Sequence, residues 1–220
     1  MLSKEREKII RSLQTKKGRQ KSGLCLVEGK KVIAMCGDWL EYEFDRTMTE
    51  NFDQLVTTET PQEAAAVARI PQWGIDDIKA RPVIVVLDGV QDPGNVGAIL
   101  RLCLGFGASL ILVESADVSN PKVIRSSAGA MFQVPWLEVK RNALQQMISD
   151  LSRKVYRLEK TAAAQEISSI KKPAIVIAGS EGQGIISEIA GQSVFIKHSA
   201  DLESLNVGQA LAIVLQSLAK

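Results

Sequence analysis

The sequence contains few of the residues that build disulfide frameworks or metal sites. Its 220 residues include three cysteines and one histidine. Cys25, Cys36 and Cys103 lie far apart and form no C-x-x-C pair, so neither a disulfide framework nor a Cys/His zinc site is supported. We therefore expect a reduced protein that binds no metal.

Long apolar runs are also missing. No stretch approaches the roughly 20 residues that a membrane-spanning helix needs. The opening residues MLSKEREKII lack the charged-then-apolar order of a signal peptide. Hydrophobic residues make up 45% of the chain and charged residues 24%, close to the averages for a folded globular protein. These features predict a cytoplasmic protein with no membrane partner, of one medium and one small domain.

The net charge of +2 hides a basic leading segment. Residues 1–31 carry ten Lys or Arg against three Glu, whereas residues 38–63 carry eight acidic residues and one arginine. A basic segment suits a polyanion such as RNA, because its cations neutralise phosphates and release counterions. A solvated basic helix is an equally good interpretation. The candidate RNA contacts in this segment are Lys16, Lys17, Arg19 and Lys21.

The first part of the chain mixes helices and strands. We expect helices at 3–16, 30–35 and in the alanine-rich stretch 63–70, strands at 24–29 and 40–44, and a polar loop at 15–23. Residues 71–82, PQWGIDDIKARP, have the Pro, Gly and charge content of a linker. A domain boundary is therefore predicted near residue 80, dividing the chain into 1–79 and 80–220.

Beyond that boundary, strands and helices alternate. The apolar run VIVVLD (83–88) is typical of a strand buried on both faces. Further strands are predicted at 109–114, 154–159, 174–180 and 193–197, and helices at 96–106, 121–132 and 204–218. This alternation predicts an α/β domain with a mostly parallel sheet covered by helices.

Ligands of open parallel sheets bind beyond the carboxyl ends of the strands. The first such end here is followed by residues 88–108, where Asn95 stands at a helix start and Arg101 lies within an apolar helix. A buried arginine needs a partner, because an unpaired buried charge is very costly. A salt bridge to a neighbouring acid would satisfy it without any functional role.

Two further loops carry unusual residues. AGSEGQGI (178–185) follows a strand, allows close backbone approach and holds one acid, Glu181. It fits neither a P-loop nor G-x-G-x-x-G. In ESLNVGQALAIVL (203–215), Ser204 or Asn206 could cap the last helix. Helix capping and common glycine turns explain these residues as well as function does, so each loop taken singly is ambiguous.

Together the three loops resemble a known family. NVGAILRLCLGFGA, GSEGQG and SLNVGQALAI are similar, in order and spacing, to the three motifs of the SpoU (TrmH) family of RNA ribose methyltransferases, in the SPOUT superfamily. The segment VIRSSAGAMFQVP (123–135) also resembles the family, and the similarity covers about 140 residues. Upstream, SGLCLVEGKKVI (22–33) resembles the start of a small ribosomal-protein-like substrate domain.

The resemblance implies a fold, a reaction and partners. It implies a mostly parallel α/β domain at 80–220 with a C-terminal trefoil knot, preceded at 1–79 by a small α+β ribosomal-protein-like domain that binds RNA. The reaction would transfer a methyl group from S-adenosyl-L-methionine to a ribose 2′-hydroxyl. Ribosomal RNA is the first expectation for the substrate and transfer RNA the second. A homodimer with active sites at the subunit interface is also implied.

The resemblance also implies site residues. It places the methyl donor against Gly179, Ile196 and Leu205. It assigns catalytic or active-site roles to Asn95, Arg101, Glu181, Ser204 and Asn206. Arg101 would work with a substrate phosphate to activate the hydroxyl, acting by charge because a guanidinium is a poor base. Arg125 is a candidate phosphate contact, with an ordinary surface arginine as the equal alternative.

The sequence departs from the family pattern at Lys197, where proline is usual, and at Gly208, where serine is frequent. The spacing from Gly179 to Ile196 is shorter than usual, and His198 is expected to be structural. One alternative is a non-catalytic RNA-binding protein that keeps the fold. Another is a nucleotide-dependent oxidoreductase, which requires a glycine fingerprint after the first strand, where this chain has GVQDPGN.

Overall fold

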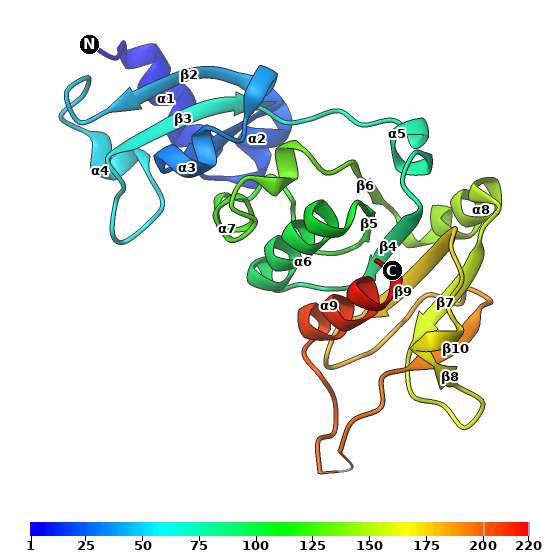
Figure 1. The fold of residues 1–220 in the computed structure, drawn as a ribbon. Helices are drawn as coiled ribbons and strands as arrows, with labels where there is room; N and C mark the ends of the chain where they lie inside the picture. Colours follow the sequence, from blue (N-terminus) through cyan, green and yellow to red (C-terminus); the bar gives the residue numbers. More distant parts are fainter. Residues whose placement is uncertain (200, 220) are drawn as a thin grey trace.

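Two β-sheets organise the chain (Figure 1). The computed structural model describes residues 1–199 and 201–219. A three-stranded antiparallel sheet with the order β1-β3-β2 comes first, and a seven-stranded parallel sheet with the order β6-β5-β4-β9-β7-β10-β8 follows. The mostly parallel sheet predicted from the sequence is confirmed.

The first sheet consists of β1 (Leu24–Glu28), β2 (Leu40–Asp45) and β3 (Ala64–Arg69). The elements around it are α1 (Lys4–Leu13), α2 (Lys16–Ser22), α3 (Lys30–Ile33), η1 (Gly37–Trp39) and α4 (Phe52–Leu55). The predicted polar loop at 15–23 was wrong, because the Thr15 hydroxyl accepts a hydrogen bond from the Gly18 N–H and caps α2. A Cβ at Gly18 would lie 1.9 Å from the Ser12 carbonyl oxygen, so only glycine allows α2 to pass so close to α1.

The helix predicted at 63–70 was also wrong, because these residues form the central strand β3. Ala64, Ala66 and Ala68 belong to one core cluster, while Ala65 and Val67 belong to another on the opposite face. Alanine favours helix as an isolated residue. Here the two buried faces of a central strand require small apolar side chains, and tertiary packing overrides the intrinsic preference.

The second sheet contains the strands predicted beyond residue 80 and two that were not predicted. Its strands are β4 (Val83–Asp88), β5 (Ser109–Val113), β6 (Trp136–Val139), β7 (Lys154–Leu158), β8 (Gln165–Glu166), β9 (Ala174–Gly179) and β10 (Gln192–Phe195). Strands β6 and β8 are the additions. The elements between them are α5 (Ile75–Lys79), α6 (Pro93–Phe106), α7 (Pro121–Ser126), η2 (Ala130–Phe132), α8 (Arg141–Leu151), η3 (Ile167–Ser169) and α9 (Val207–Leu218).

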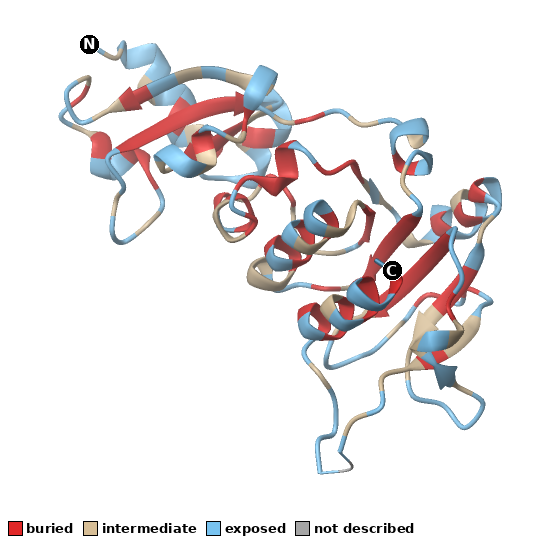
Figure 2. Ribbon diagram, in the orientation of Figure 1, coloured by how far each residue is buried: buried red, intermediate tan, exposed pale blue. Residues whose placement is uncertain are grey.

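Helices cover both faces of the parallel sheet, whose central strands β4 and β9 are almost wholly buried (Figure 2). Helices α6 and α9 pack together on one face, and α8 contributes Leu144 and Ile148 to the core on the other. The core on the face covered by α6 and α9 also includes Cys25 of β1 and Ala66 of β3. The small sheet therefore packs into the same apolar cluster as the large one. Within residues 1–199 and 201–219, every helix is too short or too polar to cross a bilayer.

The helix predicted at 121–132 is interrupted. It ends at Ser126, and Gly129 has a φ of +83°, a left-handed conformation that favours glycine. A Cβ there would lie 2.5 Å from Cβ of Met35, so the break also lets this segment pack against the small sheet's side of the molecule.

Candidate active site

Three side chains from distant segments meet at the carboxyl edge of the parallel sheet. Asn95 Nδ2 donates a hydrogen bond to Glu181 Oε1 at 2.8 Å. Asn206 Nδ2 donates to Asn95 Oδ1 at 3.0 Å and to the same Glu181 oxygen at 3.1 Å. We call these three residues the amide–carboxylate triangle. It brings together one residue from each of the three motif loops.

Helix capping and the triangle use different atoms of the same side chain. Asn206 Oδ1 accepts from the N–H groups of Gly208 and Gln209, at 2.9 and 3.3 Å, and so caps α9. Its Nδ2 is then directed to the triangle. At the start of α6, Asp92 is the N-cap and accepts from the Asn95 N–H at 2.8 Å. Capping therefore fixes the side chain of Asn206 and the backbone of Asn95, and it does not compete with a functional role.

The glycine loop approaches the end of β9 closely. Ser180 and Gly184 form an isolated antiparallel bridge, which folds the loop back on itself. A Cβ at Gly179 would lie 2.0 Å from the carbonyl carbon and oxygen of Gly184, a separation that no side chain could occupy. Gly179 is therefore required for the turn that carries Glu181 to the triangle.

Two of the three residues expected at the methyl donor, Ile196 and Leu205, line one small hollow, and Gly179 is not part of its lining. The hollow has a volume of about 170 Å³, and its walls include Leu158, Phe195, Ile196, Leu205 and Ala210. Ser204 lines it too, whereas Lys197 does not, so the departure from proline leaves the lining unchanged. His198 lies at the hollow, and its Nδ1 is 2.9 Å from the Ser199 carbonyl oxygen, a local backbone contact.

Arg101 differs from the sequence-based expectation of a buried charge. It is exposed on α6, and no hydrogen bond or ion pair joins its side chain to another residue within 1–199 and 201–219. The argument from a buried arginine was therefore wrong, and so was the alternative of a structural salt bridge. The guanidinium remains available to a ligand.

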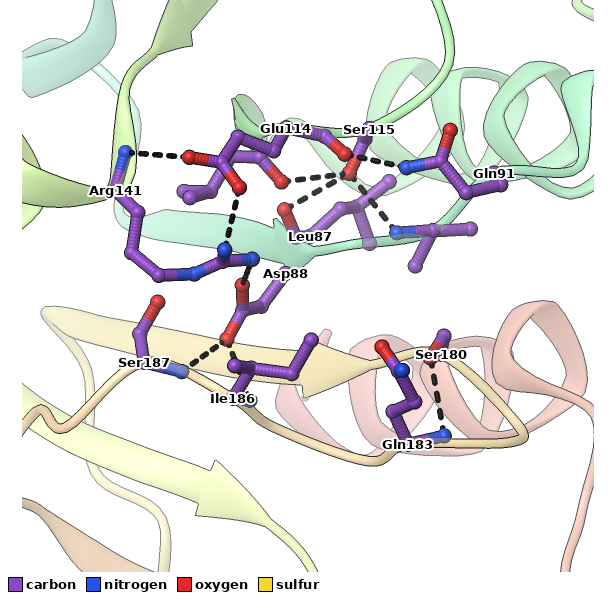
Figure 3. Close-up of polar contacts among 12 residues, drawn as sticks. Leu87, Asp88, Gln91, Glu114, Ser115, Arg141, Ser180, Gln183, Ile186 and Ser187 are labelled. Carbon is purple, nitrogen blue, oxygen red and sulfur yellow. Dashed lines mark hydrogen bonds and ion pairs between the residues drawn. The ribbon is translucent and has the colours of Figure 1, made fainter.

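Sequence reasoning missed a buried charge network beside these loops, shown in Figure 3. Asp88, at the end of β4, is fully buried, and its Oδ2 accepts from the N–H groups of Ile186 and Ser187 at 2.8 and 2.6 Å. Its Oδ1 accepts from Arg141 Nη2 at 3.0 Å, and Arg141 also pairs with Glu114. The acid that closes VIVVLD is a visible signal, but its partners lie 53 and more residues away.

Hydrogen bonding determines the charge state of Asp88. Burial by itself raises the pKa of this carboxyl group, but hydrogen bonds from Ser187, Arg141 and Ile186 outweigh it. The net result is a pKa below the ordinary value of 3.8. An ionised Asp88 therefore holds residues 186 and 187, which follow the glycine loop, against the end of β4.

The predicted RNA contacts lie in different environments. Lys16, Lys17 and Lys21 are exposed on α2. Arg19 on the same helix is only 3% exposed, and it pairs with Asp117 at 2.6 Å while donating to Ser119 and to the Leu13 carbonyl. The expectation that Arg19 contacts RNA is therefore corrected. Its guanidinium is buried, and its N–H groups join α2 to the loop after β5.

Arg125 on α7 is partly exposed and pairs with the buried Glu28 of β1 at 3.0 Å. It also donates to the Thr57 hydroxyl at 2.7 Å. Arg125 is therefore not a free surface arginine, and its role as a phosphate contact stays a prediction.

Comparison with known proteins fits this arrangement of loops. Residues 82–216 match the SpoU rRNA Methylase family. The chain belongs to this family. Over 97% of its length it is 29% identical to the 23S rRNA (guanosine(2553)-2′-O)-methyltransferase RlmP of Bacillus subtilis, 96% of which is covered. The family resemblance inferred from the three motifs is confirmed.

Solved structures agree with the SpoU-family fold. A TrmH-family protein from Porphyromonas gingivalis superposes with a TM-score of 0.82 and 28% identity, covering 99% of this chain and 98% of that one. An AdoMet-bound rRNA methyltransferase from Sinorhizobium meliloti gives a TM-score of 0.85 over 99% and 95% of the two chains, at 22% identity. The second likeness is one of fold alone.

Proposed function

We propose that this SpoU-family chain transfers a methyl group from S-adenosyl-L-methionine to a ribose 2′-hydroxyl of RNA. The observation that carries the proposal is the amide–carboxylate triangle, which joins the three motif loops at the ligand-binding edge of the sheet. The activity named for the Bacillus subtilis relative supports ribosomal RNA as the substrate, with transfer RNA second.

The hollow lined by Ile196, Ser204 and Leu205 offers part of a site for the methyl donor. Leu158, Ile196 and Leu205 offer apolar walls to the adenine ring, and Ser204 and backbone groups offer polar contacts. When bound, the donor supplies a methyl group activated by its sulfonium charge. Gly179 contributes by keeping the loop backbone close to the end of β9. Ile196 and Leu205 would hold the donor directly, as part of the apolar lining of the hollow.

Arg101 would act on the RNA. Its exposed guanidinium is a cation, so it can neutralise a phosphate beside the reacting hydroxyl and stabilise the developing oxyanion. The triangle fixes the Glu181 carboxylate and the two asparagines in one orientation. Their role is to keep the loops that face the donor and the RNA in register.

We further propose a trefoil knot and a homodimer. The strand order supports the knot, since the chain leaves β10 near the far edge of the sheet and returns to place α9 beside α6. Exposed apolar side chains support the dimer, since Leu104 on α6 and Ile213 on α9 are 36% and 42% exposed. Arg101 lies one turn before Leu104 on the same helix face, which would place it at the subunit interface.

The division into an RNA-binding unit at 1–79 and a methyltransferase unit at 80–220 also remains a proposal. It is supported by the separate antiparallel sheet formed within residues 24–69. A cytoplasmic location stays a prediction.

The deciding experiment measures transfer of labelled methyl from the donor to unmodified RNA, with products resolved by RNA size and by nucleoside. Arg101→Ala should lower transfer by roughly a hundredfold, the effect of removing one charge-stabilising donor. Arg46→Ala is the matched control, because Arg46 is another exposed arginine and pairs with Asp53 in the small unit. Label on a base would refute ribose methylation, and absence of donor binding would favour the non-catalytic alternative.

The exposed lysines of α2 give a test of the RNA surface. Replacing Lys16, Lys17 and Lys21 by alanine removes three cations that could each neutralise a phosphate. The slope of log binding constant against log salt should become shallower by about 2 to 3. If the slope stays unchanged, α2 is not part of the RNA interface.

A further inference from the structure

A second hollow lies between the small sheet and α7. Its volume is about 520 Å³, and its lining includes Glu28, Lys30, Lys31, Thr58, Gln62 and Arg125. Glu28 ends β1 of the small sheet, whereas Arg125 belongs to α7 beside α6. We call this hollow the seam pocket, because any ligand in it would touch both parts of the chain at once.

One buried carboxylate oxygen at the seam pocket has no hydrogen-bond partner among the residues that the structure describes. The Glu28 side chain is 1% exposed, and its Oε1 accepts from Arg125 at 3.0 Å and from the Thr57 N–H and hydroxyl at 3.0 and 2.5 Å. Its Oε2 is buried and accepts no hydrogen bond from the residues that the structure describes. A carboxylate oxygen without a donor is costly to bury, so this atom is poised to accept an N–H or O–H group from a ligand.

The rim of the seam pocket has the opposite character. Lys30 and Lys31 are exposed, and Lys30 pairs with Glu63 at 2.6 Å in the solvent. A ligand that fits the seam pocket must therefore present a hydrogen-bond donor to the buried Glu28 oxygen and an anionic group to the exposed lysines of the rim. A free phosphate or sulfate fails the first requirement, since it would face the Glu28 carboxylate. An RNA nucleotide meets both, because its base carries N–H groups and its phosphate is anionic.

The geometry points to guanine, and we propose that the seam pocket binds an unpaired guanine nucleotide of the RNA. Guanine presents two adjacent donors, N1–H and the 2-amino group, with which it can approach one carboxylate oxygen. The amino groups of adenine and cytosine stand beside a ring nitrogen acceptor, and the imino group of uracil stands between two carbonyls, which Glu28 would repel. Lys30 and Lys31 would then contact the phosphate. This inference rests on the proposed function in taking RNA as the substrate.

The first test changes the RNA and needs no protein variant. The full chain, without methyl donor, is titrated with a short fluorescein-labelled oligouridylate that carries one central guanosine. Replacing that guanosine by inosine removes only the 2-amino group. The guanosine probe should bind roughly tenfold more tightly than those with inosine, adenosine or cytidine, the effect of one hydrogen bond to a charged group. Equal binding of the guanosine and inosine probes would overturn the proposal.

The second test changes the protein. Glu28→Gln keeps an oxygen for Thr57 and Arg125 but puts an amide N–H₂ where Oε2 faces the guanine. The preference for guanosine should then collapse to about twofold or less, whereas the exposed rim control Glu63→Gln should keep it. If Glu28→Gln keeps the preference for guanosine, the guanine binds at another place in the protein and the assignment to the seam pocket is overturned.

A crosslink keeps the location testable even if Glu28→Gln does not fold. The same probe carrying 6-thioguanosine is irradiated with the wild-type chain, and the crosslinked peptides are mapped by mass spectrometry. Attachment within residues 28–32, 57–62 or 125 supports the proposal, and attachment only outside them refutes it. Because none of these readouts uses the methyl donor, a chain that prefers guanosine but transfers no methyl would contradict the proposed function alone.

Discussion

Replacing Asp88 by asparagine should destabilise the protein by about 3 kcal/mol, although the two side chains have nearly the same shape. The fully buried carboxylate accepts two backbone N–H groups and the Arg141 guanidinium (Figure 3). Asparagine loses the charge that strengthens all three hydrogen bonds, and its N–H₂ must face one of these donors. We count about 1 kcal/mol for each of the three hydrogen bonds. The bond to Arg141 is not counted higher than the other two, because the arginine side chain is 30% exposed and keeps Glu114 as a partner.

Urea or thermal unfolding measures this loss. For a chain of 220 residues the expected fall in Tm is about 6–12 °C. Glu114→Gln is the matched control, since it removes the other partner of Arg141 from a site where the acid is 51% exposed. That change should cost at most about 1 kcal/mol. If Asp88→Asn unfolds within about 0.5 kcal/mol of the wild type, the charged anchor for residues 186 and 187 does not exist.

Acid provides an independent check on Asp88. Its folded-state pKa lies below the ordinary 3.8, so its contribution to stability is complete above that pH and is lost as the pH falls through the folded value. The free energies of unfolding of wild type and Asp88→Asn should therefore differ most near neutral pH and converge below pH ~4. A gap that does not narrow in acid would contradict the ionised state.

Three further substitutions test other parts of the structure. Arg19→Ala should cost about 3–5 kcal/mol in urea unfolding, because it leaves the mostly buried Asp117 without its cation, and an unchanged stability would show that the pair with Asp117 does not form. Ile213→Glu should shift the chain from dimer to monomer in sedimentation, and an unchanged mass would exclude this face of α9 from the interface. Gly179→Ala should abolish donor binding in calorimetry, since its Cβ would lie 2.0 Å from Gly184, and normal affinity would show that the loop tolerates displacement.

The pattern of apolar residues by itself predicts much of the fold. VIVVLD and AIVIA indicate strands buried on both faces, and the alternation with helices leaves a parallel sheet as the natural solution. The same local reasoning failed for the alanines of β3, because their neighbours on both sides come from strands distant in the chain. Helix preference is a property of single residues, whereas the burial of both strand faces is a property of the assembled sheet.

The site divides in the same way. The order and spacing of the three motifs predicted Asn95, Glu181 and Asn206 as site residues, because both are properties of the sequence itself. That the three meet at 2.8–3.1 Å depends on β4 and β9 ending, and α6 and α9 beginning, at one edge of the sheet. The pairings of Asp88 with Arg141, of Arg19 with Asp117 and of Glu28 with Arg125 were decided only by tertiary structure. A charge in a sequence shows that it needs a partner or water, but only the folded chain selects which one.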